Sequence, residues 1–404
     1  MPGTEFFGAE ERKEVNDVLN TTALFRYNHD ALRQGMWKAK ELETEVSKFT
    51  GAAYAHAVSS GSAAVACALA ASGIGHGDEV IVPPFTFLAT IEAVLYAGAL
   101  PVFAEIDETL CLSADGIANA ITDKTKAVLL VHMCGAAADM DSISQLCDTK
   151  GIKLIEDAGQ ALGAFYLGKS VGLFGTAGAF SFDFFKITTA GEGGLFITNE
   201  EETYKKADTF SDHGHSHVGD NRGMEPHPYL GFNFRISELH AAVGLAQMRR
   251  IDKILEFNKK NKKYIKDQLK EIDGVTFRYM PDEDGDSATF LNFFLPSTEL
   301  TQKAVARLAE EGVGGINYWY TNMYHFINQW DHLKNLSSAA PLAIHHLGAP
   351  QDYAKLELPK SQDVVGRLIS LGIRATWTEK EIKALANDLT RIIKEVLATQ
   401  TINK

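Results

Sequence analysis

The sequence predicts an α/β protein in which a mostly parallel sheet forms the larger part and a smaller α+β part follows. Short, almost uninterrupted apolar runs alternate with helical stretches between about residues 57 and 198, as in parallel sheets that are buried on both faces. The length of 404 residues fits one large domain plus a smaller one. We therefore expect a large domain over residues 1–250 and a small domain over residues 251–404.

The N-terminal half predicts two helices and then the strands of the sheet. Spaced apolar residues predict a helix from about Gly8 to Leu19 and a second one from about Trp37 to Phe49. A short strand then enters the turn Ser59–Ser62, which opens an alanine-rich helix. Further strands, separated by helical stretches, are predicted over residues 79–82, 101–107, 127–132, 151–157 and 195–198.

The C-terminal half is more mixed. Ser237 is placed to cap a long, lysine-rich helix that runs to about Glu271 and would connect the two parts. A strand over residues 290–295 and a helix over 301–311 follow. The last helix begins near Thr378, where an acidic first turn suits the helix dipole.

Composition excludes several classes of protein. The formal net charge of −13 argues against a nucleic-acid partner, because phosphates would be repelled. No apolar stretch approaches the length of about 20 residues that spans a membrane, and no signal peptide is evident. The four cysteines are scattered, which is typical of buried thiols in a reducing compartment. We expect a cytoplasmic protein.

The turn Ser60-Gly61-Ser62 is a candidate phosphate-binding element. It lies between a strand and a helix, where free backbone N–H groups and the positive end of the helix dipole attract anions. An ordinary capped helix fits the same residues, and taken alone the turn favours that simpler interpretation.

Lys186 is the candidate nucleophile. It lies between an aromatic run, residues 180–185, and the glycine-rich turn 191–194. Apolar surroundings penalise a charged amine, so its pKa falls and it becomes able to form a Schiff base. A lysine beside aromatic residues also commonly extends its amine to solvent, and the stretch by itself favours that alternative.

Three further residues favour the functional interpretation of the turn at residues 60–62 and of Lys186. Asp157 and Gln160 follow a predicted strand, at the sheet edge where ligands of parallel sheets bind, and Phe87 lies in the turn after another strand. A phosphate seat, a flat ring, a carboxylate and an amine are what pyridoxal phosphate requires, since the carboxylate keeps the pyridine nitrogen protonated. Three alternating histidines (His213, His215 and His217) lie in a Gly- and Ser-containing loop without ligand spacing, so no metal site is predicted.

In this order the motifs resemble the DegT/DnrJ/EryC1/StrS sugar aminotransferases over nearly the whole chain. They are Ser-Ser-Gly-Ser-Ala-Ala (59–64), Val-Pro-Pro-Phe-Thr-Phe-Leu-Ala-Thr (82–90), Glu-Asp-Ala-Gly-Gln-Ala (156–161), Phe-Ser-Phe-Asp-Phe-Phe-Lys (180–186), Gly-Glu-Gly-Gly (191–194), Asp-His-Gly (212–214) and Gly-Phe-Asn-Phe-Arg (231–235). The resemblance implies the fold of type I pyridoxal-phosphate transferases, with a mostly parallel sheet of about seven strands, and a homodimer with shared active sites.

The resemblance also implies roles for single residues. Lys186 would carry the cofactor and move a proton, and Asp157 would pair with the ring nitrogen. Phe87 would lie against the ring, and Gln160 would reach its phenolic oxygen. The phosphate would be held by Gly61, Ser62, Ser181 and, from the partner subunit, Asn233.

Two positions qualify the resemblance. Arg235 would bind the carboxylate of the amino donor, although a salt bridge would explain this arginine equally well. Asp183 stands where many members have histidine. Dehydratase members replace the lysine with histidine, so Lys186 favours a transaminase.

The family's typical substrate is a keto sugar, often nucleotide-linked, with L-glutamate as the amino donor. The opening residues 1–11 are similar to the branch that converts 8-oxo-3-deoxy-manno-octulosonate to 8-amino-3,8-dideoxy-manno-octulosonate for lipopolysaccharide. That substrate has a carboxylate and no nucleotide, which would make anion contacts of Arg26, Arg33, His213, His215 and His325. The same residues would also fit solvent-facing loops.

Three other functions stay open at this point. The first is an aminotransferase for a nucleotide-linked 4-keto-6-deoxy (or 3-keto) sugar. The second is a non-catalytic binding protein with the same fold. The third, a lyase of the cysteine desulfurase kind, is disfavoured because no cysteine lies in a mobile loop motif.

Overall fold

Seven strands form the larger sheet of the computed structural model, which describes residues 3–219 and 221–399. In chain order these are β1 (Tyr54–Val58), β2 (Glu79–Val82), β3 (Leu100–Phe103), β4 (Thr125–Val131), β5 (Lys153–Asp157), β8 (Ala177–Ser181) and β9 (Gly194–Thr198). They are arranged β1-β9-β8-β5-β4-β2-β3, and β9 alone runs antiparallel to its neighbours. The mostly parallel sheet predicted from the apolar runs is confirmed.

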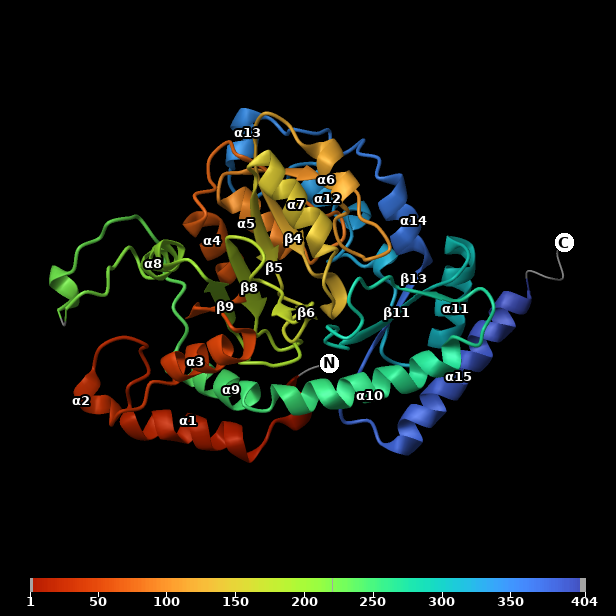
Figure 1. Cartoon of the computed structure of the whole chain (residues 1–404), viewed down its shortest axis with the longest axis horizontal. Helices are drawn as coiled ribbons and strands as arrows, with labels where there is room; N and C mark the ends of the chain where they lie inside the picture. The colour runs from red at the N-terminus through yellow and green to blue at the C-terminus, as the bar shows by residue number, and fades with distance from the viewer. Residues whose placement is uncertain (1–2, 220, 400–404) are drawn as a thin grey trace.

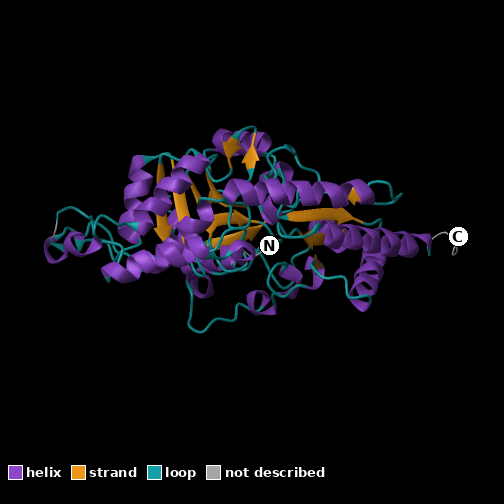
Figure 2. Ribbon diagram, turned by 90° about the horizontal axis from the view of Figure 1, so that it is seen from below, coloured by secondary structure: helices purple, strands orange, loops and turns teal. Residues whose placement is uncertain are grey.

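Helices lie on both sides of this sheet, as Figure 2 shows. Its apolar strands are buried on both faces, which explains why they read as continuous runs in the sequence. The helices of this part are α1 (Ala9–Thr21), α2 (Asp30–Arg33), α3 (Lys38–Thr50), α4 (Gly61–Ala71), α5 (Ala89–Tyr96), α6 (Ala114–Ala120), α7 (Met140–Lys150), α8 (Glu201–Phe210) and α9 (Glu238–Met248).

A second, antiparallel sheet forms the C-terminal part, to the right in Figure 1. Its order is β10-β11-β13-β12, from β10 (Thr276–Phe277), β11 (Phe290–Phe294), β12 (Ile316–Asn317) and β13 (Leu368–Gly372). The helices α10 (Ile251–Leu269), α11 (Thr298–Glu310) and α15 (Glu379–Ala398) pack around it over a separate apolar core. The domain boundary at residue 250 stays a prediction, with α10 beginning directly after it.

The long helix predicted from Ser237 to about Glu271 is two helices, and that prediction is wrong. Ser237 caps α9 as expected, since its Oγ accepts a hydrogen bond from His240 N at 3.2 Å. Arg250 interrupts the helix with φ −119° and ψ 9°. Its guanidinium binds Phe6 O and the carboxylate of Glu10, so contacts with the N-terminal segment accompany the break.

Several short elements were not predicted individually. They are η1 (Gly3–Phe6), η2 (Met133–Gly135), β6 (Phe165–Tyr166), β7 (Lys169–Ser170), η3 (Arg222–Met224), η4 (Trp319–Thr321), η5 (Ile327–Gln329), α12 (Asp331–Lys334), α13 (Ala343–Leu347) and α14 (Pro359–Arg367).

An aromatic segment of the C-terminal part lies against the larger sheet. Thr86 N donates to His325 O and Leu88 N donates to Tyr324 O, both at 3.0 Å, and Ile327 N donates to Pro84 O at 3.0 Å. These bonds hold His325 beside the turn that follows β2.

The structure also bears on the cysteines and on the expected absence of a membrane span. Each of the four cysteines is buried and unpaired, and burial raises the pKa of their thiols. Across residues 3–219 and 221–399, no helix combines the length and the apolar character that crossing a membrane requires.

Candidate active site

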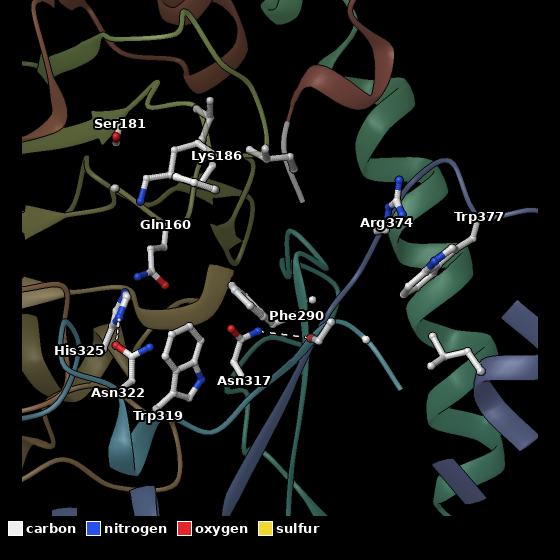
Figure 3. Close-up of a pocket in the computed structure, with 18 residues that line it drawn as sticks. Gln160, Ser181, Lys186, Phe290, Asn317, Trp319, Asn322, His325, Arg374 and Trp377 are labelled. Carbon is white, nitrogen blue, oxygen red and sulfur yellow. Dashed lines mark hydrogen bonds between the residues drawn. The ribbon is translucent and has the colours of Figure 1, made fainter. Parts of the chain in front are cut away.

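Two adjoining cavities meet at Lys186. The first cavity, of about 540 Å³, lies where β5 and β8 end and α4 begins, and it includes Asp157, Phe87 and Ser60–Ser62 in its lining. The second cavity, of about 610 Å³, extends from Lys186 toward β12 and β13 (Figure 3). Both are lined by Gly159, Gln160, Ser181, Phe185, Lys186 and His325.

The start of α4 forms an anion seat in the first cavity. Ser60 is the N-cap, and its Oγ accepts a hydrogen bond from Ala63 N at 3.1 Å. Within the described ranges the backbone N–H groups of Gly61 and Ser62 have no acceptor in the chain. Free donors at the positive end of a helix bind phosphate. Ser181, at the end of β8, lies directly against Gly61.

Gly61→Ala is expected to weaken cofactor binding. A Cβ at this position would lie 2.7 Å from Ser181 Cβ and 2.8 Å from Ser181 Oγ, so either the start of α4 or the end of β8 must shift. We expect a rise of about tenfold or more in the cofactor's dissociation constant, measured by titration of the cofactor's absorbance. Gly75→Ala is the control, since its Cβ would come no nearer than 4.0 Å to any other atom. Unchanged cofactor affinity in Gly61→Ala would contradict the seat.

Asp157 presents an oriented carboxylate to the same cavity. Thr90 Oγ1 donates to Asp157 Oδ2 at 2.7 Å, and Gly159 N donates to Oδ1 at 3.0 Å. Thr86 Oγ1 lies 2.8 Å from Thr90 Oγ1 and extends this arrangement. Hydrogen bonds to a carboxylate favour its ionised form. The two donors therefore fix the orientation of the carboxylate in the cavity.

Lys186 lies in the loop that joins β8 to β9. Its backbone is fixed on both sides, because its N–H donates to Asp183 O at 3.0 Å and its carbonyl accepts from Gly3 N at 2.8 Å. Burial lowers the pKa of the Lys186 amine below its ordinary value, while the charges of Asp183 and Asp157 act in the opposite direction. The amine points toward the side of the cavity where Gln160 and His325 lie (Figure 3). A lowered pKa increases the fraction of nucleophilic, neutral amine.

Phe87, His325 and Gln160 complete the walls near the amine. The ring centroids of Phe87 and His325 are 5.4 Å apart. Burial and the charge of Lys186 lower the pKa of His325 to about 4, so its ring is neutral at pH 7. Gln160 Oε1 accepts from Cys134 N at 3.2 Å, which leaves the amide NH₂ group available as a donor.

The structure does not bring the other predicted contacts to these cavities within the chain. Neither cavity lining includes Arg26, Arg33, His213, His215, Asn233 or Arg235. Arg26 is buried and binds Glu43 at 2.7 Å and Ala57 O. Arg235 Nη1 binds Asp212 Oδ1 at 2.6 Å, which is the salt bridge considered as its alternative role. Asn233 Oδ1 accepts from Arg235 N at 3.3 Å.

His217 belongs to the same loop as His213 and His215 and has a structural role. Its ring lies between Asp208, at 2.7 Å, and Asp212, at 2.8 Å, and stacks on Tyr27 with centroids 4.0 Å apart. Burial disfavours the charged ring, but the two carboxylates outweigh this effect and raise the pKa of His217 to about 9. The loop is therefore clamped to the N-terminal segment by a charged histidine.

The clamp predicts a dependence of stability on pH. A pKa raised on folding stabilises the protein fully below the unfolded value of about 6.5, and that contribution is lost as pH rises through about 9. Between pH 7 and pH 10 the Tm of wild type should fall by about 1–3 °C more than that of His217→Gln, measured by calorimetry. His346→Gln, at an exposed position, is the control. Parallel Tm curves for wild type and His217→Gln would contradict the clamp.

Sequence reasoning missed several residues of the site. Thr90 belongs to a quoted motif, yet only its contact with Asp157 reveals its role as a donor. Asn317, Trp319, Asn322 and Arg374 line the second cavity from the C-terminal part. No spacing in the sequence indicates that these residues approach Lys186.

The chemistry of the donor set fits pyridoxal phosphate. Unpaired backbone N–H groups suit its phosphate, the fixed carboxylate suits its ring nitrogen, and a partly neutral amine suits its aldehyde. Phe87, with 43% of its surface exposed, offers a face to a flat ring.

Comparison with known proteins gives concordant matches. The profile of the DegT/DnrJ/EryC1/StrS aminotransferase family matches residues 8–390. A GDP-perosamine synthase of Vibrio cholerae is 37% identical over 285 residues, which cover 69% of this chain and 75% of that protein. The spore coat polysaccharide biosynthesis protein SpsC of Bacillus subtilis is 30% identical over 397 residues, or 96% of this chain and 95% of that one.

A solved structure extends the likeness to the cofactor. NtdA of Bacillus subtilis, crystallised with the bound cofactor PMP, superposes with a TM-score of 0.79 and 25% sequence identity. The superposition covers 97% of this chain and 84% of that one. The fold is thus similar to that of a protein crystallised with the bound cofactor PMP.

Proposed function

The chain belongs to the DegT/DnrJ/EryC1/StrS aminotransferase family, and from that premise we propose that it transfers the amino group of L-glutamate to a nucleotide-linked keto sugar. It is a sugar aminotransferase that depends on pyridoxal phosphate. The observation that carries the proposal is the convergence of Lys186, Asp157 and the start of α4 on one cavity.

Each of these groups has a proposed task. The cofactor, when bound, supplies an electron sink that stabilises negative charge on the carbon losing or gaining a proton. Gly61, Ser62 and Ser181 would bind its phosphate, Phe87 would pack on its ring, and Gln160 would donate to its phenolic oxygen.

Lys186 and Asp157 are the proposed catalytic residues. The Lys186 amine would hold the cofactor and, once released from it, would move a proton between Cα of the amino compound and C4′ of the cofactor. Thr90 and Gly159 orient the Asp157 carboxylate, which would pair with the ring nitrogen of the cofactor and favour its protonated form. The neutral ring of His325 adds no competing positive charge beside the amine.

The substrate class rests on the relatives. The Vibrio cholerae match is named for a GDP-linked product, and the Bacillus subtilis match is named for polysaccharide biosynthesis. These names support a nucleotide-linked keto sugar, such as a 4-keto-6-deoxy sugar, as the acceptor.

One observation favours a second candidate, free 8-oxo-3-deoxy-manno-octulosonate. This sugar carries a carboxylate, and the lining of the second cavity contains Lys186 and Arg374 but neither aspartate nor glutamate. An acidic substrate would enter such a cavity without charge repulsion.

The test separates the two half-reactions. The protein is loaded with pyridoxal phosphate and treated with L-glutamate, and the change in the cofactor's absorbance reports removal of the amino group. After glutamate is removed, a GDP-linked 4-keto-6-deoxy sugar or 8-oxo-3-deoxy-manno-octulosonate is added. Recovery of the original spectrum identifies the acceptor. No response to glutamate would refute the aminotransferase proposal.

A homodimer is also proposed. Asn233 lies outside both cavities in its own chain, and its neighbours Leu230 and Phe232 are 95% and 61% exposed. Phe185, beside the catalytic lysine, is 70% exposed. A second copy that covers these apolar side chains would bring Asn233 to the phosphate of the first.

A further inference from the structure

The second cavity contains a cation to which the steps above give no task. Arg374 follows β13, and Figure 3 places it with Trp377 at the end of the cavity opposite Lys186. The amide side chains of Gln160, Asn317 and Asn322 also line this cavity, Gln160 and Asn322 on the side of Lys186 and Asn317 nearer the middle of the view. The cavity thus has a reactive amine at one end and a guanidinium at the other.

The charge of this cavity is opposite to that of the whole chain. The protein carries a net charge of −13, yet the lining contains two cationic side chains and no carboxylate. The first cavity differs, because Asp157, Asp183 and Glu192 line it. A concave site of one sign concentrates ligands of the opposite sign.

The backbone of Arg374 is fixed. Its carbonyl accepts a hydrogen bond from Asn261 Nδ2 at 2.8 Å, which ties it to α10. The preceding residue, Ile373, donates its N–H to Thr289 O at 2.9 Å. The guanidinium therefore projects from a rigid segment of the C-terminal part.

The side chain of Arg374 is partly engaged. Its Nε lies 3.3 Å from Glu5 Oε1, and Glu5 is anchored by Thr376 N at 3.2 Å and Thr376 Oγ1 at 3.0 Å. In the part of the chain that the structure describes, neither Nη atom has a hydrogen-bond acceptor. The two Nη groups remain able to bind a carboxylate through paired hydrogen bonds.

We propose that Arg374 is the carboxylate-binding residue of the second cavity and determines which substrates react at Lys186. The proposal rests on the proposed function for the identity of the reacting group. A substrate would place its carboxylate on Arg374 and its amino or keto group at Lys186. The amides of Gln160, Asn317 and Asn322, which line the same cavity, would bind other polar groups of the substrate.

Arg374, which was not among the predicted contacts, fits this role better than the predicted contacts Arg235 and Arg26. Arg235 is bound to Asp212, and Arg26 to Glu43, both by contacts of 2.7 Å or less. Neither residue lines either of the two cavities at Lys186. Arg374 combines free donor groups with a place in the wall.

The experiment measures ligand binding to the pyridoxal-phosphate-loaded protein without turnover. Two of the four tryptophans, Trp319 and Trp377, line the second cavity, so tryptophan fluorescence reports its occupancy. Succinate serves as a probe for the carboxylates of the amino donor. The non-reacting acid 3-deoxy-manno-octulosonate serves as a probe for an acidic sugar.

Arg374→Gln should raise the dissociation constant of at least one probe by about 10- to 100-fold, because charge-assisted hydrogen bonds are lost. Weakened succinate binding assigns Arg374 to the amino donor, and weakened octulosonate binding assigns it to an acidic sugar. Arg374→Lys keeps the charge and should lose less affinity. Arg391→Gln, an exposed ion-paired arginine of α15, should bind both probes as wild type does.

Unchanged affinity for both probes in Arg374→Gln would overturn the proposal, as would an equal loss in Arg391→Gln. If Arg374→Gln fails to fold, Arg374→Lys decides the matter through its affinities for the two probes. Because the probes do not react, these results are independent of the proposed function. That function fails separately, if glutamate leaves the cofactor's absorbance unchanged.

Discussion

Lys186→Ala is expected to lower kcat by about 10⁴-fold or more, because one substitution removes both the covalent attachment of the cofactor and the group that moves the proton. The phosphate seat at Gly61 and Ser62 and the carboxylate of Asp157 remain in this variant. It should therefore still bind pyridoxal phosphate, but without a covalent bond. Steady-state rates and the absorbance of the bound cofactor measure the two effects.

A chemical readout separates this result from misfolding. Reduction with borohydride followed by peptide mass analysis should find the cofactor on the peptide that contains Lys186 in wild type and on no peptide in the variant. Lys303→Ala, which removes an exposed lysine of α11, is the matched control and should retain both activity and labelling. Near-normal turnover by Lys186→Ala would remove the basis of the catalytic assignment.

The larger sheet could be predicted because its signal is local. A strand buried on both faces carries successive apolar residues, so β2 and β4 can be recognised from residues 80–82 and 127–131. The end of β5 then locates Asp157 without knowledge of tertiary contacts. Lys186 can be identified from the aromatic run before it, from the glycine-rich turn after it, and from the resemblance of residues 180–186 to a family motif.

The break between α9 and α10 could not be predicted in the same way. Local residues favour a continuous helix, and the contacts that accompany the break come from Phe6 and Glu10, more than two hundred positions earlier in the chain. Tertiary contacts of this kind override helix propensity, which amounts to less than about 1 kcal/mol per residue.

The second cavity escaped prediction for a related reason. Its far wall is formed by Asn317, Arg374 and Trp377, which approach Lys186 only because the antiparallel sheet packs beside the loop after β8. These residues line the same cavity as Lys186 only when the C-terminal part packs against the larger sheet. His325 is an intermediate case, since the sequence identified the residue, but only the structure shows that burial keeps its ring neutral.

Asp157→Asn is expected to lower kcat by about 10²- to 10³-fold, a loss of the size seen when one preorganised electrostatic partner is removed from an active site. The amide preserves the shape of the side chain and a hydrogen bond to Thr90, but it carries no charge to keep the ring nitrogen protonated. Without that proton the cofactor is a weaker electron sink, so proton transfer by Lys186 slows although the amine is still present.

The same substitution should change the spectrum as well as the rate. In wild type the Asp157 carboxylate should favour the protonated ring nitrogen, whereas in Asp157→Asn that nitrogen should lose its proton at lower pH, and the pH dependence of the bound cofactor's absorbance should change accordingly. Asp148→Asn, at an exposed position on α7, is the control. A variant with wild-type rates and a wild-type spectrum would show that Asp157 does not face the ring. Because Thr90 and Gly159 orient the carboxylate from two sides, the loss should follow from the missing charge and not from a displaced side chain.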